Sequence, residues 1–158
     1  MDFWIREPIP WDSRWYSHKI NGPALRYEFG ICIQTGWIVW VNGPYPAGEW
    51  SDLAIARSSL MQLLEPWERF IADGGYRDTS GSAVTPTGQH AFHDRQRATV
   101  RARQETVHGR FKCWGTLSQR YRHRLQKHGI IVHSIATITQ LSLMNSERTF
   151  DVDYEEQI

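Results

Sequence analysis

The sequence has very few cysteines, and those it has match no structural or metal-binding pattern. Cys32 and Cys113 are the only two cysteines in 158 residues, and no C-x-x-C pair occurs. This spacing excludes a disulfide-rich scaffold and a cysteine-based zinc site, so both thiols are expected to be reduced. The histidines match no standard zinc spacing either, so zinc is not the expected metal.

Long apolar runs are also absent. No segment approaches the roughly 20 apolar residues of a membrane span, and the N-terminus lacks the apolar core of a signal peptide. We therefore expect a soluble protein, neither secreted nor in a membrane, that is nuclear if eukaryotic and otherwise cytoplasmic. No G-x-S-x-G elbow occurs, and no glycine-rich phosphate loop follows a predicted strand, which disfavours serine hydrolases and P-loop enzymes.

Acidic residues are nearly missing from residues 95–128. This segment holds ten lysines and arginines: Arg95, Arg97, Arg101, Arg103, Arg110, Lys112, Arg120, Arg122, Arg124 and Lys127. Its only acid is Glu105, although the net charge of the whole chain is only +1. A solvated charged helix usually alternates its charges, whereas a block of one sign favours a polyanionic partner. Phe111, Trp114 and Tyr121 lie between the cations, which favours nucleic acid.

Hydrophobic periodicity predicts one α/β domain over residues 1–144, with a mixed sheet flanked by helices. The expected elements are a strand at 3–5, a hairpin over 25–34 and 36–43, a helix over 52–64, a short strand before Asp73, a loop over 77–93, and helices over 93–114 and 128–144. Ser51 offers an N-cap to the first helix. The last helix is rich in β-branched residues, so a strand remains an alternative there. Residues 145–158 are expected to be a disordered acidic tail.

Helical spacing predicts which faces of the two long helices are buried. The apolar stripe of the helix over 93–114 consists of Val100, Val107, Phe111 and Trp114. The stripe of the helix over 128–144 consists of Ile131, Ile135, Ile138 and Leu141. Glu105 lies on the opposite face of the first helix. Its neighbours there are Arg101, His108, Gly109 and Lys112, and Gly109 leaves space beside it.

A carboxylate among cations has two interpretations. The first is an ordinary ion-pair network on a helix surface. The second is a metal site that acts on phosphate, because Mg²⁺ and Mn²⁺ require oxygen ligands while the phosphate requires cations. Asp73, followed by two glycines at the predicted end of a strand, supplies a second acid for such a site. The pair Asp73 and Glu105 makes the metal interpretation competitive.

Four blocks of the sequence together resemble one known family over nearly the whole chain. They are NGPALRYEFGICIQTGWIVWVNGPYPAGEWSDLAIAR, ADGGY, RARQETVHGRFK and RYRHRLQKHGIIVHSIATITQL. They are similar to the DDE superfamily endonuclease domain of Harbinger-type transposases. The resemblance implies a ribonuclease H-like fold and a triad of two Asp and one Glu that binds two Mg²⁺ or Mn²⁺ ions. It also implies hydrolysis or strand transfer of DNA phosphodiesters.

The resemblance assigns roles to individual acids. Asp73 of ADGGY corresponds to the second catalytic acid and Glu105 of RARQETVHGRFK to the third, while Asp52 of WSDL corresponds to a supporting acid. The family's first acid lies in a block like Asp-Gly-Thr-Asp-Phe, of which MDFWI resembles the end. Asp2 then stands three positions after that acid, and an odd offset on a strand points to the opposite face. We therefore expect a truncated first strand without its first ligand, unless Asp2 replaces it through a shifted register.

DNA is the expected partner, and no membrane is expected. The candidate DNA-binding residues are Arg101, His108, Lys112, Arg120, Arg122, Arg124 and Lys127. A separate DNA-binding partner protein and a homo-oligomer both remain open. The alternative to a metal-dependent nuclease is an inactive transposase remnant that serves as a DNA-binding or protein-interaction module.

Overall fold

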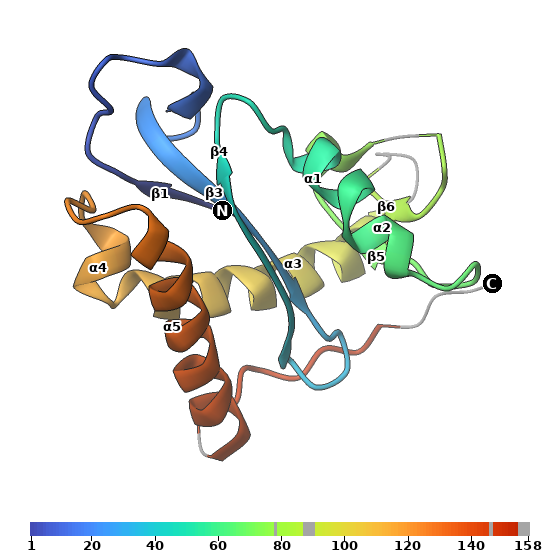
Figure 1. Ribbon diagram of the computed structural model, residues 1–158. Coiled ribbons are helices and arrows are strands. Elements are labelled where there is room, and N and C mark those ends of the chain that lie inside the picture. The colour runs from blue at the N-terminus through green and yellow to red at the C-terminus, as the bar shows by residue number, and fades with distance from the viewer. Residues whose placement is uncertain (78, 87–90, 146, 155–158) are drawn as a thin grey trace.

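The computed structural model describes residues 1–77, 79–86, 91–145 and 147–154, and its centre is a long twisted β-hairpin (Figure 1). One antiparallel sheet contains β1 (Asp2–Trp4), β2 (Tyr16–Ser17), β3 (Gly22–Ile31) and β4 (Ile38–Pro46). A separate parallel pair consists of β5 (Phe70–Ile71) and β6 (Ala83–Val84). The helices are α1 (Asp52–Ser58), α2 (Leu60–Leu63), α3 (Ala91–Lys112), α4 (Gly115–Ser118) and α5 (Gln126–Asn145), with 3-10 turns η1 (Ser13–Trp15) and η2 (Gly74–Tyr76). The expected combination of strands and helices is confirmed. The expected mixed sheet is not formed by the described residues, in which the antiparallel sheet and the parallel pair are separate.

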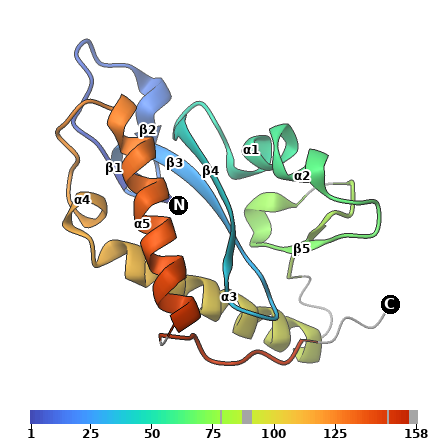
Figure 2. The same ribbon diagram turned by 60° about the horizontal axis from the view of Figure 1, so that its bottom comes forward.

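The hairpin separates two groups of elements. In both ribbon views α4 and α5 lie on one side of β3 and β4, while α1, α2 and β5 lie on the other (Figures 1 and 2). The long helix α3 passes across the hairpin and contacts both α5 and β5. This arrangement places the middle of α3 between the two groups.

The predicted hairpin is confirmed, and its first strand is more deeply buried than expected. Tyr27 and Phe29 alternate into the core, as the period of two predicts. The side chains between them are also covered, because Arg26 is 8% exposed and Glu28 is 5% exposed. Gly36 forms the turn with φ of 73°, a left-handed conformation that glycine adopts without strain.

Only part of the predicted apolar stripe of α3 lies in the core. Val107 and Phe111 are buried against β3, which confirms the centre of the stripe. The prediction was wrong for Trp114, which is 39% exposed, because α3 ends at Lys112 and the helical spacing no longer applies there. The prediction also did not include Arg103 among the buried residues of α3, although Arg103 is only 3% exposed.

The long helix near the C-terminus is confirmed as α5, and the strand alternative is excluded. Its buried face consists of His128, Val132, Ile135, Ala136, Thr139 and Leu143. Of the predicted stripe, Ile138 and Leu141 are instead 45% and 53% exposed. Apolar residues occur on two faces of this helix, so periodicity alone does not select the face that packs against the sheet.

The region between β4 and α3 departs from its predicted form in two places. Ser51 caps α1 as expected, since its side chain accepts a hydrogen bond from the backbone N–H of Ala54. The expected single helix then breaks at Ser59, whose φ of −144° and ψ of −82° are not helical. The predicted loop over 77–93 contains β6, held by parallel pairing with β5, and residues 78 and 87–90 of it lie outside the described residues.

The described part of the acidic tail, residues 147–154, has no helix or strand. It contacts α3 at Arg110, whose Nη1 lies 3.8 Å from Oε2 of Glu147, and at Arg103. There the backbone carbonyl of Phe150 accepts hydrogen bonds from Nε and Nη2 of Arg103. Cys32 and Cys113 are both free thiols, as expected. Within the described residues, no helix combines the length and apolar character that crossing a membrane requires.

Candidate functional site

A cleft of about 1210 Å³ is bordered by the second half of β3, by β5 and by α3. Its walls contain five acids: Glu28, Asp52, Glu68, Asp73 and Glu105. They also contain the basic residues Lys19, Arg69, Arg101, Arg103, His108 and Lys112. The structure thus brings two of the three predicted metal-binding acids, Asp73 and Glu105, to one cleft, together with three of the predicted DNA-binding residues.

Asp73 lies directly after the parallel pair β5–β6, at the carboxyl end of β5. Its Oδ1 accepts a hydrogen bond from the backbone N–H of Gly75 at 2.8 Å, so that Asp73 caps η2. The side chain is exposed, and no Lys or Arg of the described chain forms an ion pair with it. A carboxylate in this state retains oxygen lone pairs for a ligand in the cleft.

Glu105 stands on the exposed face of α3, as helical spacing predicts. Its side chain is 74% exposed, and Oε1 lies 3.6 Å from Nδ1 of His108. A side chain built on Gly109, one turn away, would meet no atom within 4 Å, which agrees with the predicted free space.

His108 differs from its predicted role as a cation. Burial lowers the pKa of its imidazole from 6.5 to about 4, although the Glu105 carboxylate opposes this change. The ring packs edge-on to Phe29, at 5.8 Å between ring centroids. His108 is therefore neutral at pH 7, and the positive charge beside Glu105 is carried by Arg101 and Lys112.

Asp2 lies in a buried ion pair instead of in the cleft wall. Its side chain is 1% exposed and receives two hydrogen bonds from Arg26, from Nε to Oδ1 and from Nη2 to Oδ2, each 2.8 Å long. The Ser17 hydroxyl donates to Oδ2 as well. Burial opposes ionisation, but the bonds from Arg26 and Ser17 outweigh it and lower the pKa of Asp2. Because both oxygens are engaged, this geometry argues against Asp2 as a metal ligand.

Asp52 connects the ion pair of Asp2 to the cleft. Its Oδ2 accepts a hydrogen bond from Nζ of Lys19 at 2.7 Å, and Oδ1 lies 3.5 Å from Nε of Arg26. The side chain is 15% exposed and occupies the first turn of α1. Because Asp52 contacts both Lys19 and Arg26, its position suits a supporting acid that orients these two cations.

Glu28 is a cleft acid that the sequence did not point to. Its Oε2 accepts a hydrogen bond from the indole N–H of Trp40 at 2.8 Å, whereas no partner for Oε1 is found in the described part of the chain. Burial raises the pKa of this carboxyl, opposed by hydrogen bonding from Trp40 and Tyr76. The alternation of β3 predicts that Glu28 faces solvent, on the side opposite Tyr27 and Phe29. Its burial therefore follows from tertiary packing and not from the strand pattern.

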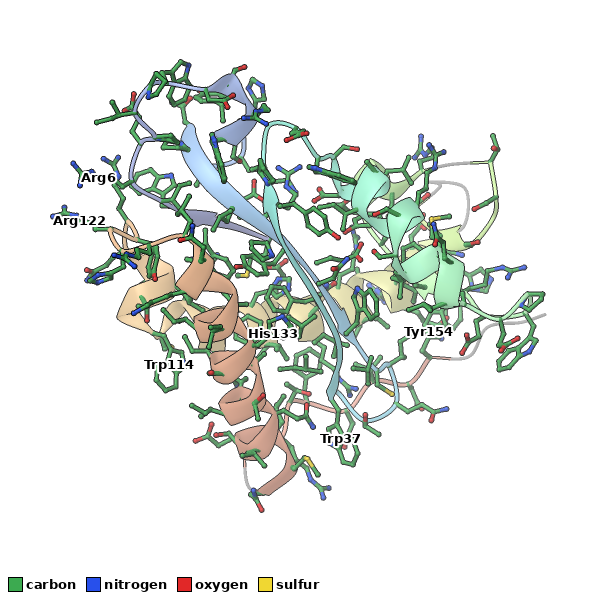
Figure 3. All side chains as sticks on the ribbon, in the orientation of Figure 1. Arg6, Trp37, Trp114, Arg122, His133 and Tyr154 are labelled. Atoms are coloured by element: carbon green, nitrogen blue, oxygen red, sulfur yellow. The ribbon has the colours of Figure 1, made fainter. Side chains whose placement is uncertain are left out.

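The remaining predicted DNA-binding residues are not in the cleft. Arg120, Arg122 and Arg124 follow α4, and Lys127 is the second residue of α5. Figure 3 shows Arg122 at the opposite end of the molecule from α1 and α2, next to Arg6. The basic segment of the sequence therefore forms two separate surfaces.

The donor atoms of the cleft suit a hard divalent cation. Asp73 and Glu105 offer carboxylate oxygens, and Mg²⁺ in phosphate-processing sites is typically held by one or two carboxylates together with substrate phosphate and water. No group of three His, Cys, Asp or Glu residues that could hold a metal ion occurs among the described residues. The candidate ligands for such a site are Asp73 and Glu105, which line the same cleft as Arg101 and Lys112.

Comparison with known proteins identifies one family. The family model described as DDE superfamily endonuclease matches residues 5–140, well over half of the chain. The match includes Asp52, Asp73 and Glu105 and begins after Asp2. Neither the curated proteins nor the solved structures yielded a match.

Proposed function

Because this chain belongs to the DDE superfamily endonuclease family, we propose that its cleft cleaves DNA phosphodiesters with the help of divalent metal ions. The observation that carries the proposal is the shared cleft of Asp73 and Glu105, with Arg101 and Lys112 in its walls. A nuclease of this kind acts by hydrolysis or by strand transfer, which use the same in-line displacement at phosphorus.

Each group in the cleft has a distinct role. Asp73 and Glu105 hold Mg²⁺ or Mn²⁺, with two ions as the family resemblance implies. Bound metal supplies a nucleophilic water and stabilises the leaving oxygen. Arg101 and Lys112 bind the non-bridging oxygens of the phosphate and offset its charge. Asp2 is not included, because Arg26 and Ser17 occupy its oxygens.

The finer classification is part of the same proposal. The blocks around Asp73 and Glu105 favour the Harbinger-type branch of transposases and a ribonuclease H-like arrangement. In the described residues β1 and β5 belong to separate sheets, and the cleft lies along the part of β3 that continues past β1. The described cleft therefore supplies two acids of the three in a DDE triad.

The proposal is tested by plasmid nicking in Mg²⁺ and in Mn²⁺. We expect nicking that EDTA abolishes and that falls at least tenfold in Asp73→Asn and in Glu105→Gln, because each substitution removes a charged oxygen ligand with little change in shape. Glu49→Gln is the matched control, since Glu49 is exposed and does not line the cleft. Nicking that persists in both cleft variants would contradict the assignment.

A second candidate function is favoured by the incomplete acid set. With Asp2 engaged by Arg26, only Asp73 and Glu105 of the three predicted metal ligands line the cleft, which fits a remnant that binds DNA or protein without cleaving it. The same experiment separates the two functions. Metal-independent DNA binding by a protein that nicks in neither metal would support the remnant.

A further inference from the structure

A second basic surface lies away from the cleft, where β1 runs beside the segment that follows α4. We define it as the distal basic surface, consisting of Arg6, Arg120, Arg122, Arg124 and Lys127. All five side chains are exposed, and none of them lines the cleft. Arg6 and Arg122 project from the same end of the molecule in Figure 3. The sequence did not connect Arg6 with the others, because more than 110 positions separate them.

Backbone pairing holds this surface in a fixed geometry. Ile5 and Tyr121 form a parallel bridge, in which the N–H of Tyr121 donates to the carbonyl of Trp4 at 2.9 Å and the N–H of Arg6 donates to the carbonyl of Tyr121 at 2.8 Å. Ile5 is 0% and Tyr121 is 3% exposed. Because side chains alternate along extended backbone, the residues on either side of these two point outward.

The cations on this surface have no acidic partner among the described residues. Ion pairs elsewhere join Arg14 to Asp12, Lys19 to Asp52, Arg26 to Asp2, Arg97 to Asp94 and Arg110 to Glu147. Within the described residues, no ion pair or hydrogen bond to an oxygen involves the charged groups of the distal basic surface. Five like charges held together without compensation favour a polyanionic partner.

Aromatic and concave features accompany the charge. The guanidinium of Arg120 lies 5.1 Å from the ring centroid of Trp4, which is 39% exposed and tethered by a hydrogen bond from its indole N–H to the carbonyl of Ile20. A hollow of about 540 Å³ is lined by Tyr121, Arg122, His123, Arg124, Lys127 and Ile131. A hollow with a cationic rim can receive a phosphate backbone, while the Trp4 contact keeps Arg120 in place.

We propose that the distal basic surface binds the phosphate backbone of duplex DNA at a position separate from the cleft. The charge pattern requires a polyanion, and the choice of DNA among polyanions rests on the proposed function. The surface presents arginines and a lysine on rigid backbone, which fits contacts to a backbone of regularly spaced phosphates. It anchors DNA that lies outside the reacting phosphodiester, so it contributes affinity without entering the chemistry.

The salt dependence of DNA binding provides the test. Fluorescence anisotropy of a labelled duplex in EDTA measures binding to the full chain without any nuclease step. We expect the slope of log K against log salt to become shallower by about 1.8 in the double variant Arg122→Gln/Arg124→Gln, because each lost phosphate contact removes about 0.9. The control Arg95→Gln/Arg148→Gln removes the same charge from exposed positions outside both surfaces and should leave the slope near that of wild type.

Several outcomes would overturn the proposal. An unchanged slope in Arg122→Gln/Arg124→Gln would do so, and so would an equal loss in the control, since net charge alone would then explain binding. Competition by polyglutamate as strong as competition by duplex DNA, at equal total charge, would point to an acidic protein partner instead. Circular dichroism checks that both double variants fold. The two proposals can fail separately. If the wild type does not nick DNA but the salt slope still becomes shallower by about 1.8 in Arg122→Gln/Arg124→Gln, the nuclease function is refuted and DNA binding by the distal basic surface is supported.

Discussion

His128 is a titratable side chain enclosed by the core. Its Nδ1 lies 2.8 Å from the hydroxyl of Tyr27, and no partner for Nε2 is found in the described residues. Burial lowers the pKa of His128 from 6.5 to about 4. The neutral ring therefore shares one hydrogen bond inside an aromatic cluster with Phe3 and Tyr121.

The depressed pKa of His128 predicts a loss of stability in mild acid. The pKa of His128 is lower in the folded chain than in the unfolded chain, so the unfolded chain binds the proton more tightly. The stability that neutral His128 contributes is therefore complete above pH 6.5 and is lost as pH falls toward 4. Between pH 7 and pH 5 this amounts to about 2 kcal/mol. The variant His128→Gln has no imidazole here, so the difference in unfolding free energy between wild type and variant should shrink by that amount. Urea unfolding at both pH values measures it, and a constant difference would show that His128 does not titrate in this range.

Arg103 is a buried arginine whose structural role could not be predicted from the sequence. It belongs to the basic segment, yet its guanidinium donates to the carbonyls of Ile33 and Phe150, at 2.7 Å for Ile33, and is withdrawn from solvent. The fork of the guanidinium suits two carbonyls on different segments. One of the ten cations that favour nucleic acid by composition therefore connects the hairpin turn, α3 and the tail.

At the scale of elements, α5 offers a direct comparison of its two apolar faces. Ile135 is 4% exposed and packs in the core, whereas Ile138 is 45% exposed. We expect Ile135→Ala to reduce the free energy of unfolding by about 2–5 kcal/mol and Ile138→Ala by less than about 1 kcal/mol. The two substitutions share one helix and one chemistry, so helix propensity cancels. Similar losses in urea unfolding would mean that both faces are covered in solution.

Elements with strong local signals were predictable from the sequence, and those held by tertiary contacts were not. Alternation over the hairpin and the cap at Ser51 are local features, and both were confirmed. The break at Ser59 was missed because the apolar period continues across it, and the broken turn is held by the hydrogen bond from the Ser59 hydroxyl to the carbonyl of Ile55. Strand β6 has two residues in a polar segment, so only its pairing with β5 defines it.

For the molecule as a whole, the sequence pointed to Asp73 and Glu105, which line one cleft, but not to the residues that surround them. The neighbours of Glu105 followed from helical geometry, whereas the match of Asp73 to a second catalytic acid followed from the family resemblance. The contact of Asp2 with Arg26 depends on the pairing of β1 with β3, and the contact of Glu28 with Trp40 on the pairing of β3 with β4. Such contacts are long-range, and no local spacing encodes them.

The position of the cleft between two groups of elements predicts how metal affects global stability. The cleft is bordered by β3, by β5 and by α3, so an ion held by Asp73 and Glu105 binds the folded chain and not the unfolded one. Such a ligand stabilises by RT ln(1 + [L]/Kd), which is about 1.4 kcal/mol at ten times Kd. We expect Mn²⁺ to raise the Tm of wild type and to have a smaller effect on Asp73→Asn and Glu105→Gln, with Glu49→Gln as the matched control.

Differential scanning calorimetry at constant ionic strength separates this effect from general screening, because Na⁺ replaces Mn²⁺ in the reference samples. Two carboxylates that share an ion repel each other when the metal is absent. If Asp73 and Glu105 form such a site, neutralising either acid relieves this repulsion, and both cleft variants should start from an equal or higher Tm than wild type. Loss of a site made by the acid pair therefore shows two changes: a metal-free Tm no lower than that of wild type, and a smaller Mn²⁺ response. An Mn²⁺ response that is the same in all four proteins would place the bound ion elsewhere and remove the acid pair from the proposed chemistry.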